Sequence, residues 1–141
     1  MSLLNIFKPR RPLVMLVDDD FNQLDLFEAF LEALNCKSIK VSEGKDAPVT
    51  AEKYKPQLIL MDIMMPEITG LQILKILKLK PSTKDIPVLM VTGEQKISDL
   101  ETAFKLGAAD YIIKPVDRGN FEEKVKKLLS SAGYSFPATK H

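Results

Sequence analysis

The sequence is poor in the residues that build cysteine-based sites. Its 141 residues include one cysteine, Cys36, one histidine, His141, and no tryptophan. A single cysteine excludes a disulfide framework within the chain and argues against a cysteine-based metal site. We therefore expect Cys36 to be a small buried apolar group near the start of a strand. We do not assign His141, at the very end of the chain, as a phosphodonor.

The sequence also has no excess charge of one sign and no long hydrophobic run. Its 20 Lys and Arg residues nearly balance 19 Asp and Glu residues, whereas a dedicated nucleic-acid binder usually carries a basic excess. No run of about 18 apolar residues is present. The first residues, MSLLNIFKPRRP, are too short in their apolar part for a signal peptide. We expect a cytoplasmic protein with no membrane span and no direct nucleic-acid partner.

The chain does contain enough apolar residues for the core of one domain. About 45% of its residues are hydrophobic, and its length fits a single domain. We divide it into an N-terminal leader (1–11), a folded domain (12–130) and a C-terminal tail (131–141). The tail contains Gly and Pro, has no periodicity and is too short for an output domain.

Strand-like and helix-like segments alternate along the domain. The apolar runs that we interpret as strands are Leu13–Val17, the weaker Lys37–Val41, Leu58–Met61, Ile86–Val91 and the segment around Ile112 and Ile113. Apolar residues at helical spacing fall between them, such as Ile97, Leu100 and Phe104, and Pro48 predicts a short second helix near 47–54. This order predicts an α/β fold with a five-stranded, doubly wound parallel sheet and five helices. We expect Gly70 to allow a tight approach or cap at the end of the loop after Asp62, and Gly107 to end the fourth helix in a left-handed cap.

Polar side chains stand where four of these strands end. Three of the strand ends carry acidic or hydroxyl groups and the fourth carries a lysine: Asp18, Asp19 and Asp20, then Asp62, then Thr92, and finally Lys114. The loops at the carboxyl ends of parallel strands converge on one crevice. We therefore expect these side chains to meet at one edge of the sheet.

The chemistry of such a crevice follows from its charges. Closely spaced carboxylates repel one another and lose hydration, and a hard divalent cation such as Mg²⁺ relieves both costs. A carboxylate beside Mg²⁺ can attack phosphorus and form an acyl phosphate. Lys114 would neutralise the transferred group, and the Thr92 hydroxyl can donate to a phosphoryl oxygen. Taken singly these residues have plainer interpretations, because Asp20 and Thr92 are also typical helix caps and Lys114 is a typical surface charge.

Four sequence blocks make the prediction more specific. LVDDDFNQL, LILMDIMMPEITG, VLMVTGEQ and GAADYIIKP resemble, in order and spacing, the motifs of response-regulator receiver domains over roughly residues 12–130. The resemblance implies a flavodoxin-like sheet of strand order 2-1-3-4-5. It also implies a signalling switch of a two-component or phosphorelay system, not an enzyme with a separate substrate. Its donor would be a histidine kinase or histidine phosphotransfer protein, its output partner a downstream protein, and its state a monomer or weak dimer.

The resemblance also implies a magnesium site and a phosphoacceptor. Asp18 and Asp19 match the acidic pair that holds Mg²⁺, with Asp19 the more direct ligand. Asp62 matches the phosphoacceptor, which is also a metal ligand. Met64 matches the position whose backbone carbonyl, not its side chain, completes the metal shell.

The remaining matches concern the switch. Thr92 and Lys114 match the hydroxyl and ammonium that sense the phosphoryl group, and Tyr111 matches the aromatic residue that turns inward when the hydroxyl moves. Pro115 matches a proline whose peptide bond to Lys114 is cis.

Two other functions remain open at this point. An aspartate-nucleophile phosphohydrolase would place Asp-X-Asp-X-Thr/Val after the first strand, but here Asn22 occupies the last position of that pattern. A pseudo-receiver that is never phosphorylated would be a pure interaction module. The intact set of Asp18, Asp19, Asp62, Thr92 and Lys114 argues against it.

Overall fold

The computed structural model describes residues 9–93 and 97–137. Its strands are β1 (Leu13–Val17), β2 (Lys37–Val41), β3 (Leu58–Asp62), β4 (Val88–Gly93) and β5 (Asp110–Lys114). Its helices are α2 (Phe21–Ala33), α3 (Ala47–Tyr54), α4 (Gly70–Leu79), α5 (Ile97–Lys105) and α6 (Arg118–Ser131), with a 3₁₀ turn, η1 (Gly44–Asp46), before α3. The strands pair in parallel in the order β2-β1-β3-β4-β5, which confirms the predicted fold class and strand order.

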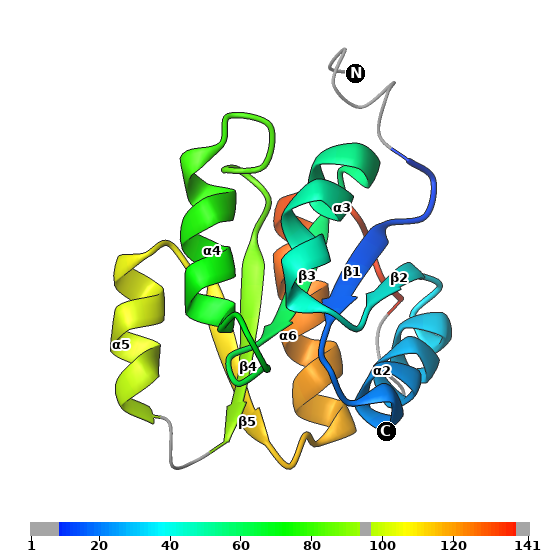
Figure 1. The fold of residues 1–141 in the computed structure, drawn as a ribbon. Coiled ribbons are helices and arrows are strands. Elements are labelled where there is room, and N and C mark those ends of the chain that lie inside the picture. Colours follow the sequence, from blue (N-terminus) through cyan, green and yellow to red (C-terminus); the bar gives the residue numbers. More distant parts are fainter. Residues whose placement is uncertain (1–8, 94–96, 138–141) are drawn as a thin grey trace.

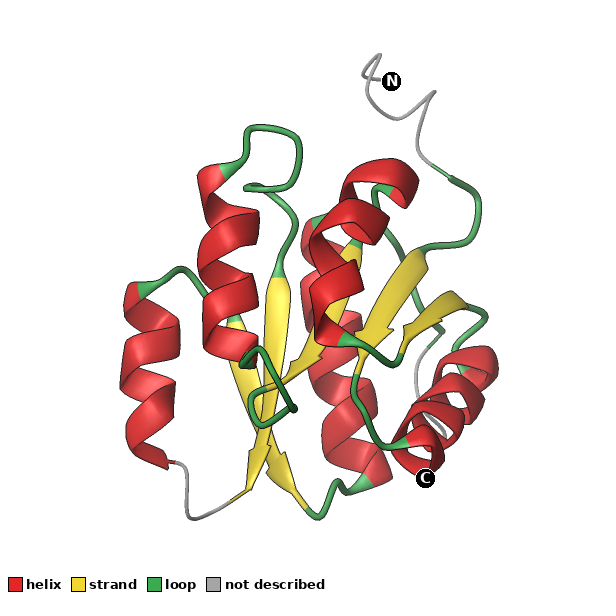
Figure 2. Cartoon of the chain, in the orientation of Figure 1, coloured by secondary structure: helices red, strands yellow, loops and turns green. Residues whose placement is uncertain are grey.

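The sheet is covered on both faces, as Figures 1 and 2 show. Alternate strand residues point to opposite faces, so each strand supplies two separate hydrophobic clusters. One cluster joins Met15, Ile59, Met61, Val88 and Met90 to residues of α3, α4 and α5. The other joins Val14, Leu16, Leu58, Leu60, Leu89, Val91 and Ile112 to residues of α2 and α6. Strands buried on both faces explain the continuous apolar runs in the sequence.

Local side chains define where the helices begin. Asp20 and Asp117 cap α2 and α6 by accepting from backbone N–H groups two and three residues later. Thr69 begins α4 with a capping box, in which the side chains of Thr69 and Gln72 each accept from the other residue's backbone N–H. Helix α3 is short and has Pro48 in its first turn, as predicted.

Three helices end in the same hydrogen-bonded turn. In α2, α5 and α6 the residue after the cap has a positive φ: Asn35 at 59°, Gly107 at 104° and Gly133 at 96°. The next N–H then bonds back to the carbonyl five residues earlier, which is the Schellman pattern. This confirms the left-handed cap predicted for Gly107. Cys36 follows Asn35 and is buried just before β2, as expected.

The same turn at Gly133 directs the following residues back onto the fold. Tyr134 is buried, and Phe136 packs against the cluster beneath α2 and α6. This contact was not predicted, because two aromatic residues in a short segment have no periodicity. Tyr134 and Phe136 thus contribute to the core, although the proposed boundary at residue 130 remains a prediction.

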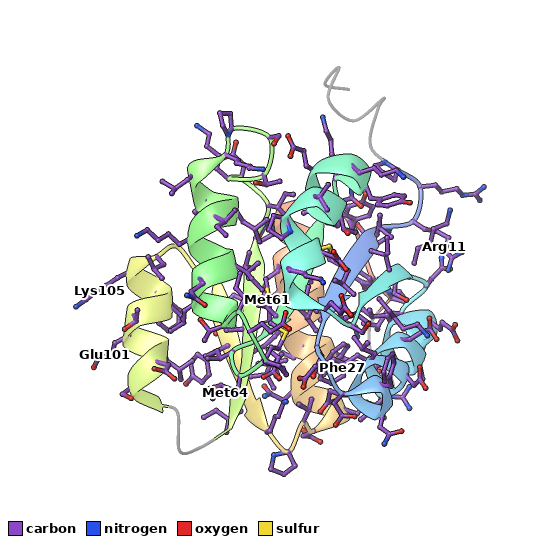
Figure 3. All side chains as sticks on the ribbon, in the orientation of Figure 1. Arg11, Phe27, Met61, Met64, Glu101 and Lys105 are labelled. Carbon is purple, nitrogen blue, oxygen red and sulfur yellow. The ribbon has the colours of Figure 1, made fainter. Side chains whose placement is uncertain are left out.

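Two details of the expected elements were wrong. Strand β4 begins at Val88, not Ile86, and runs through Thr92 to Gly93; Pro87 lies outside it, although its carbonyl accepts from the Ile59 N–H. Phe104 was expected in the buried stripe of its helix but is 46% exposed, because α5 packs Leu100 and Ala103 inward beside the edge strand. Figure 3 shows Glu101 and Lys105 on the outer side of α5.

No helix within residues 9–93 and 97–137 has the length and hydropathy needed to cross a membrane.

Gly70 is the glycine whose replacement the fold tolerates least. A Cβ added there would lie 2.2 Å from the backbone oxygen of Asp62, which cannot move without distorting β3. We expect Gly70→Ala to lower the free energy of unfolding by about 1–3 kcal/mol, as overpacking does. Urea unfolding measures this loss.

Gly119→Ala is the matched control, because the nearest atom to its added Cβ is a side-chain oxygen of Asp117 at 3.4 Å. This exposed helical position should show no loss or a small gain of about 0.4–1 kcal/mol. Equal losses at Gly70 and Gly119 would contradict the close approach to Asp62.

Candidate active site

Three charged side chains meet on one face of the sheet at the carboxyl ends of its strands. Asp18 directly follows β1, and Asp62 and Lys114 are the last residues of β3 and β5. Each of the three lies two residues beyond a strand residue that belongs to the cluster beneath α2 and α6. Because side chains alternate along a strand, all three extend from that same face of the sheet. The Lys114 Nζ lies 3.4 Å from Asp62 Oδ1 and 3.7 Å from Asp18 Oδ2. The long lysine side chain thus reaches past β4 to the centre of the sheet.

Asp19 completes an acidic cluster with Asp18 and Asp62. One carboxylate oxygen from each residue lies within 4.8 Å of the other two. Asp18 and Asp62 are 3% and 6% exposed, whereas Asp19 is open to solvent. Asp20 takes another role, because its carboxylate accepts from the Asn22 N–H at 2.9 Å and caps α2. The structure therefore separates the three consecutive aspartates into two cluster members and one helix cap.

Burial makes both inner carboxylates reluctant to ionise. It raises the pKa of Asp18 to about 6, an effect that the Asp20 N–H, donating to Asp18 Oδ1 at 2.9 Å, partly opposes. Repulsion from Asp62 adds to the rise in the pKa of Asp18. Burial also raises the pKa of Asp62, against the attraction of Lys114 and a bond from the Met64 N–H. Two buried carboxylates share one lysine, so the site has unneutralised negative charge.

One oxygen of this cluster is not satisfied within the described part of the chain. Asp18 Oδ2 is buried without a hydrogen bond, and the 3.7 Å to Lys114 Nζ exceeds a hydrogen-bond length. A buried acceptor in that position is costly unless a further group binds it. An all-oxygen donor set with surplus negative charge and an unpartnered oxygen fits a hard divalent cation.

Thr92 lies next to this cluster but faces the other way. It is 1% exposed, and its hydroxyl donates to the Gly93 carbonyl at 3.3 Å, not to a carboxylate. Asp62 is paired with Val91, so Thr92 is one residue further along and turns to the opposite face. Tyr111 is paired with Met90, which lies two residues before Thr92 in β4, so the Tyr111 side chain is on the same face of the sheet as that of Thr92. The predicted sensor and the predicted switch aromatic therefore share one face.

The two remaining predicted positions border the cluster. Met64 follows Asp62 by two residues and is 52% exposed, and its backbone N–H bonds to the Asp62 carboxylate. The Lys114–Pro115 peptide bond is cis, the form that the resemblance implied.

Gly70 allows the first turn of α4 to contact the backbone of Asp62, which is the close approach expected of a glycine at the end of this loop. One residue near the site was not given a role by the sequence. Lys124 of α6 contacts Tyr111. A lysine on an amphipathic helix normally indicates a solvated face, so no sequence signal marked it.

Comparison with known proteins identifies the class. The family model described as the response regulator receiver domain matches residues 14–126. The chain therefore belongs to the response regulator receiver domain family and is a receiver domain of two-component signalling.

Particular relatives agree with this assignment. The polar-differentiation response regulator DivK of Brucella anthropi is 36% identical over 119 residues, which is 84% of this chain and 97% of DivK. A crystal structure assigned as a response regulator from Chloroflexus aurantiacus superposes with a TM-score of 0.82 at 28% identity, covering 86% of this chain and 99% of the other.

A third relative shares the fold. The receiver domain of the sensor histidine kinase PA1611 from Pseudomonas aeruginosa has a TM-score of 0.78 at 23% identity, covering 85% and 98% of the two chains. That crystal structure has a magnesium ion coordinated in its active-site cleft.

The raised pKa of Asp18 predicts an unusual dependence of stability on pH. The pKa rises from 3.8 to about 6, so in that interval the folded protein binds a proton that the unfolded chain releases. Stability without divalent cations therefore falls as the pH rises through this window. Asp18→Asn removes the buried charge and should be more stable than wild type by about 1–3 kcal/mol near pH 7.5, with little difference near pH 4.

Urea unfolding in chelator at both pH values measures this effect. Glu123→Gln is the control, since Glu123 is an exposed carboxylate on α6. It should change stability by the same small amount at both pH values. An Asp18→Asn variant that is no more stable than wild type near pH 7.5 would contradict burial as the cause of the raised pKa of Asp18.

Proposed function

We propose that Asp62 is the phosphoacceptor of a magnesium-dependent signalling switch. The donor would be the phosphohistidine of a histidine kinase or histidine phosphotransfer protein. The observation that carries the proposal is the shared position of Lys114, whose ammonium lies within 4 Å of both buried carboxylates. This is the arrangement that an incoming phosphoryl group requires, with a nucleophile, a cation and acidic metal ligands in one place.

Asp62 is the best-placed nucleophile of the cluster. It ends the central strand β3, and its pKa is raised, which preserves electron density on an attacking oxygen. One carboxylate oxygen would form a bond to phosphorus while the bond between phosphorus and the donor's imidazole nitrogen breaks. The nitrogen keeps that electron pair, and Asp62 becomes an acyl phosphate. Lys114 would then neutralise the added phosphoryl charge.

The residues that would hold Mg²⁺ are Asp18, Asp19 and Asp62, with the backbone carbonyl of Met64. The support is the oxygen-only donor set and the unpartnered Asp18 Oδ2. A bound Mg²⁺ supplies charge neutralisation and orientation of the phosphoryl oxygens. Asp18 is oriented by the Asp20 N–H, so the turn into α2 also prepares the metal site.

Thr92 and Tyr111 would report the phosphoryl group to a partner. Thr92 now donates to Gly93, and a phosphoryl oxygen would compete for that hydrogen. Movement of Thr92 would change the space available to Tyr111, because both side chains belong to one face of neighbouring strands. Phosphorylation would thus bias an existing equilibrium and alter binding to a downstream protein. The only chemistry proposed is the protein's own phosphorylation and dephosphorylation.

The geometry favours this proposal over a phosphohydrolase. Such an enzyme needs the second carboxylate of its Asp-X-Asp pair at the reaction centre. In this chain Asp20, the candidate for that position, is engaged as the cap of α2.

Phosphorylation of Asp62 can be tested directly by mass. Incubation with acetyl phosphate and Mg²⁺ should add one phosphoryl group to wild type and none to Asp62→Asn, as measured on the intact protein. Asp20→Asn keeps an amide cap on α2 and should still be modified. A wild type that stays unmodified at saturating donor would favour the pseudo-receiver instead.

Metal binding can be tested independently of phosphorylation. Asp19→Asn should weaken Mg²⁺ binding by about tenfold or more, because it removes one anionic ligand. Calorimetric titration with MgCl₂ measures the affinity, and Asp20→Asn is the matched control one residue away. Equal affinity in the Asp19 and Asp20 variants would contradict the proposed ligand set.

A further inference from the structure

Lys124 makes three contacts with the edge strand of the sheet. From α6 its Nζ donates to the Tyr111 carbonyl at 2.6 Å and to Asp110 Oδ1 at 3.1 Å, and it lies 4.4 Å from the centre of the Tyr111 ring. The Lys124 side chain is 22% exposed. Partial burial strengthens both the ion pair and the cation–π contact compared with a solvated lysine.

Lys124 and its ion-pair partner Asp110 together hold the backbone of Tyr111. Strand β5 is the last strand of the sheet, so its outer N–H and C=O groups have no neighbouring strand. Asp110 Oδ1 accepts from the Tyr111 N–H at 2.8 Å, and Lys124 donates to the Tyr111 carbonyl. The Asp110–Lys124 pair thus occupies both outward groups of Tyr111.

The third contact of Lys124, with the Tyr111 ring, holds the side chain of Tyr111. Phe104 of α5 meets the Tyr111 ring edge to face, with centroids 6.0 Å apart and planes at 84°. Helices α5 and α6 cover opposite faces of the sheet, as Figure 1 shows, so the ring is held from both sides of the edge strand. Rotation of the Tyr111 side chain away from this position would lose the cation–π contact with Lys124.

We propose that Lys124 is a positioning residue that holds Tyr111 in the resting orientation and thereby sets how readily the switch responds. The inference rests on the proposed function, in which Tyr111 reorients after phosphorylation. We assign the observed orientation of Tyr111 to the resting state because the Thr92 hydroxyl donates to the Gly93 carbonyl and not to a group at the acidic cluster. Lys124 acts through Tyr111 and, within residues 9–93 and 97–137, makes no hydrogen bond or ion pair with the acidic cluster. Its removal should favour the reoriented state and so strengthen binding of a phosphoryl mimic.

The test compares the affinity of the full chain for beryllofluoride, a tetrahedral phosphoryl mimic, in the presence of Mg²⁺. Lys124→Met keeps most of the aliphatic side chain but removes the cation, and it should raise the affinity about two- to fivefold, the range expected for one cation–π contact. Lys124→Arg keeps a cation and should stay within about twofold of wild type. Lys127→Met, on the exposed side of the same helix, should leave the affinity unchanged.

A double-mutant cycle separates this role from a structural one. In a Tyr111→Ala background the effect of Lys124→Met on beryllofluoride affinity should disappear, whereas a loss of stability measured by urea should remain. Unchanged or lower affinity of Lys124→Met would overturn the role of Lys124, and so would the same increase in both backgrounds. A wild type that does not bind beryllofluoride at all would overturn the proposed function together with this inference.

Discussion

The ion pair network around Lys114 is the constraint on which the site depends. Asp18 and Asp62 are almost fully buried, and two buried carboxylates at this separation repel each other. Lys114 lies between them and offsets only part of that charge. A more complete neutralisation would remove the affinity for a cation, and none at all would raise both pKa values further. We expect this partial balance to make the pocket electrostatically attractive to a metal ion and, with the metal bound, to a phosphoryl group.

Strand alternation explains how this network can affect a distant surface. Asp62 and Lys114 extend to the face covered by α2 and α6, whereas Thr92 and Tyr111 extend to the face covered by α4 and α5. We therefore expect the proposed chemistry on one face to reach the other through neighbouring residues of β3 and β4. Thr92 occupies that crossing point, because it follows Val91, the residue paired with Asp62.

Much of this arrangement could be predicted from the sequence, and for a physical reason. Apolar runs in parallel strands end where the carboxyl edge begins, so the convergence of Asp18, Asp62 and Lys114 required only the order of the elements. The direction of Thr92 was not predicted, since it depends on the register between β3 and β4. Lys124 and Tyr134 were not predicted either. Their roles depend on which side of a helix meets an edge strand and on a turn at Gly133, and neither has a periodic signal.

The edge position of β5 connects these observations. An unpaired edge strand needs its outward backbone groups satisfied or shielded, and here the Asp110–Lys124 pair does so at Tyr111. The strand that carries Lys114 at its carboxyl end is therefore anchored to α6 near its start. A charged pair that protects the edge also contacts the ring that must move in the proposed switch. Stability of the sheet edge and the resting position of Tyr111 are consequently coupled through a single ammonium group.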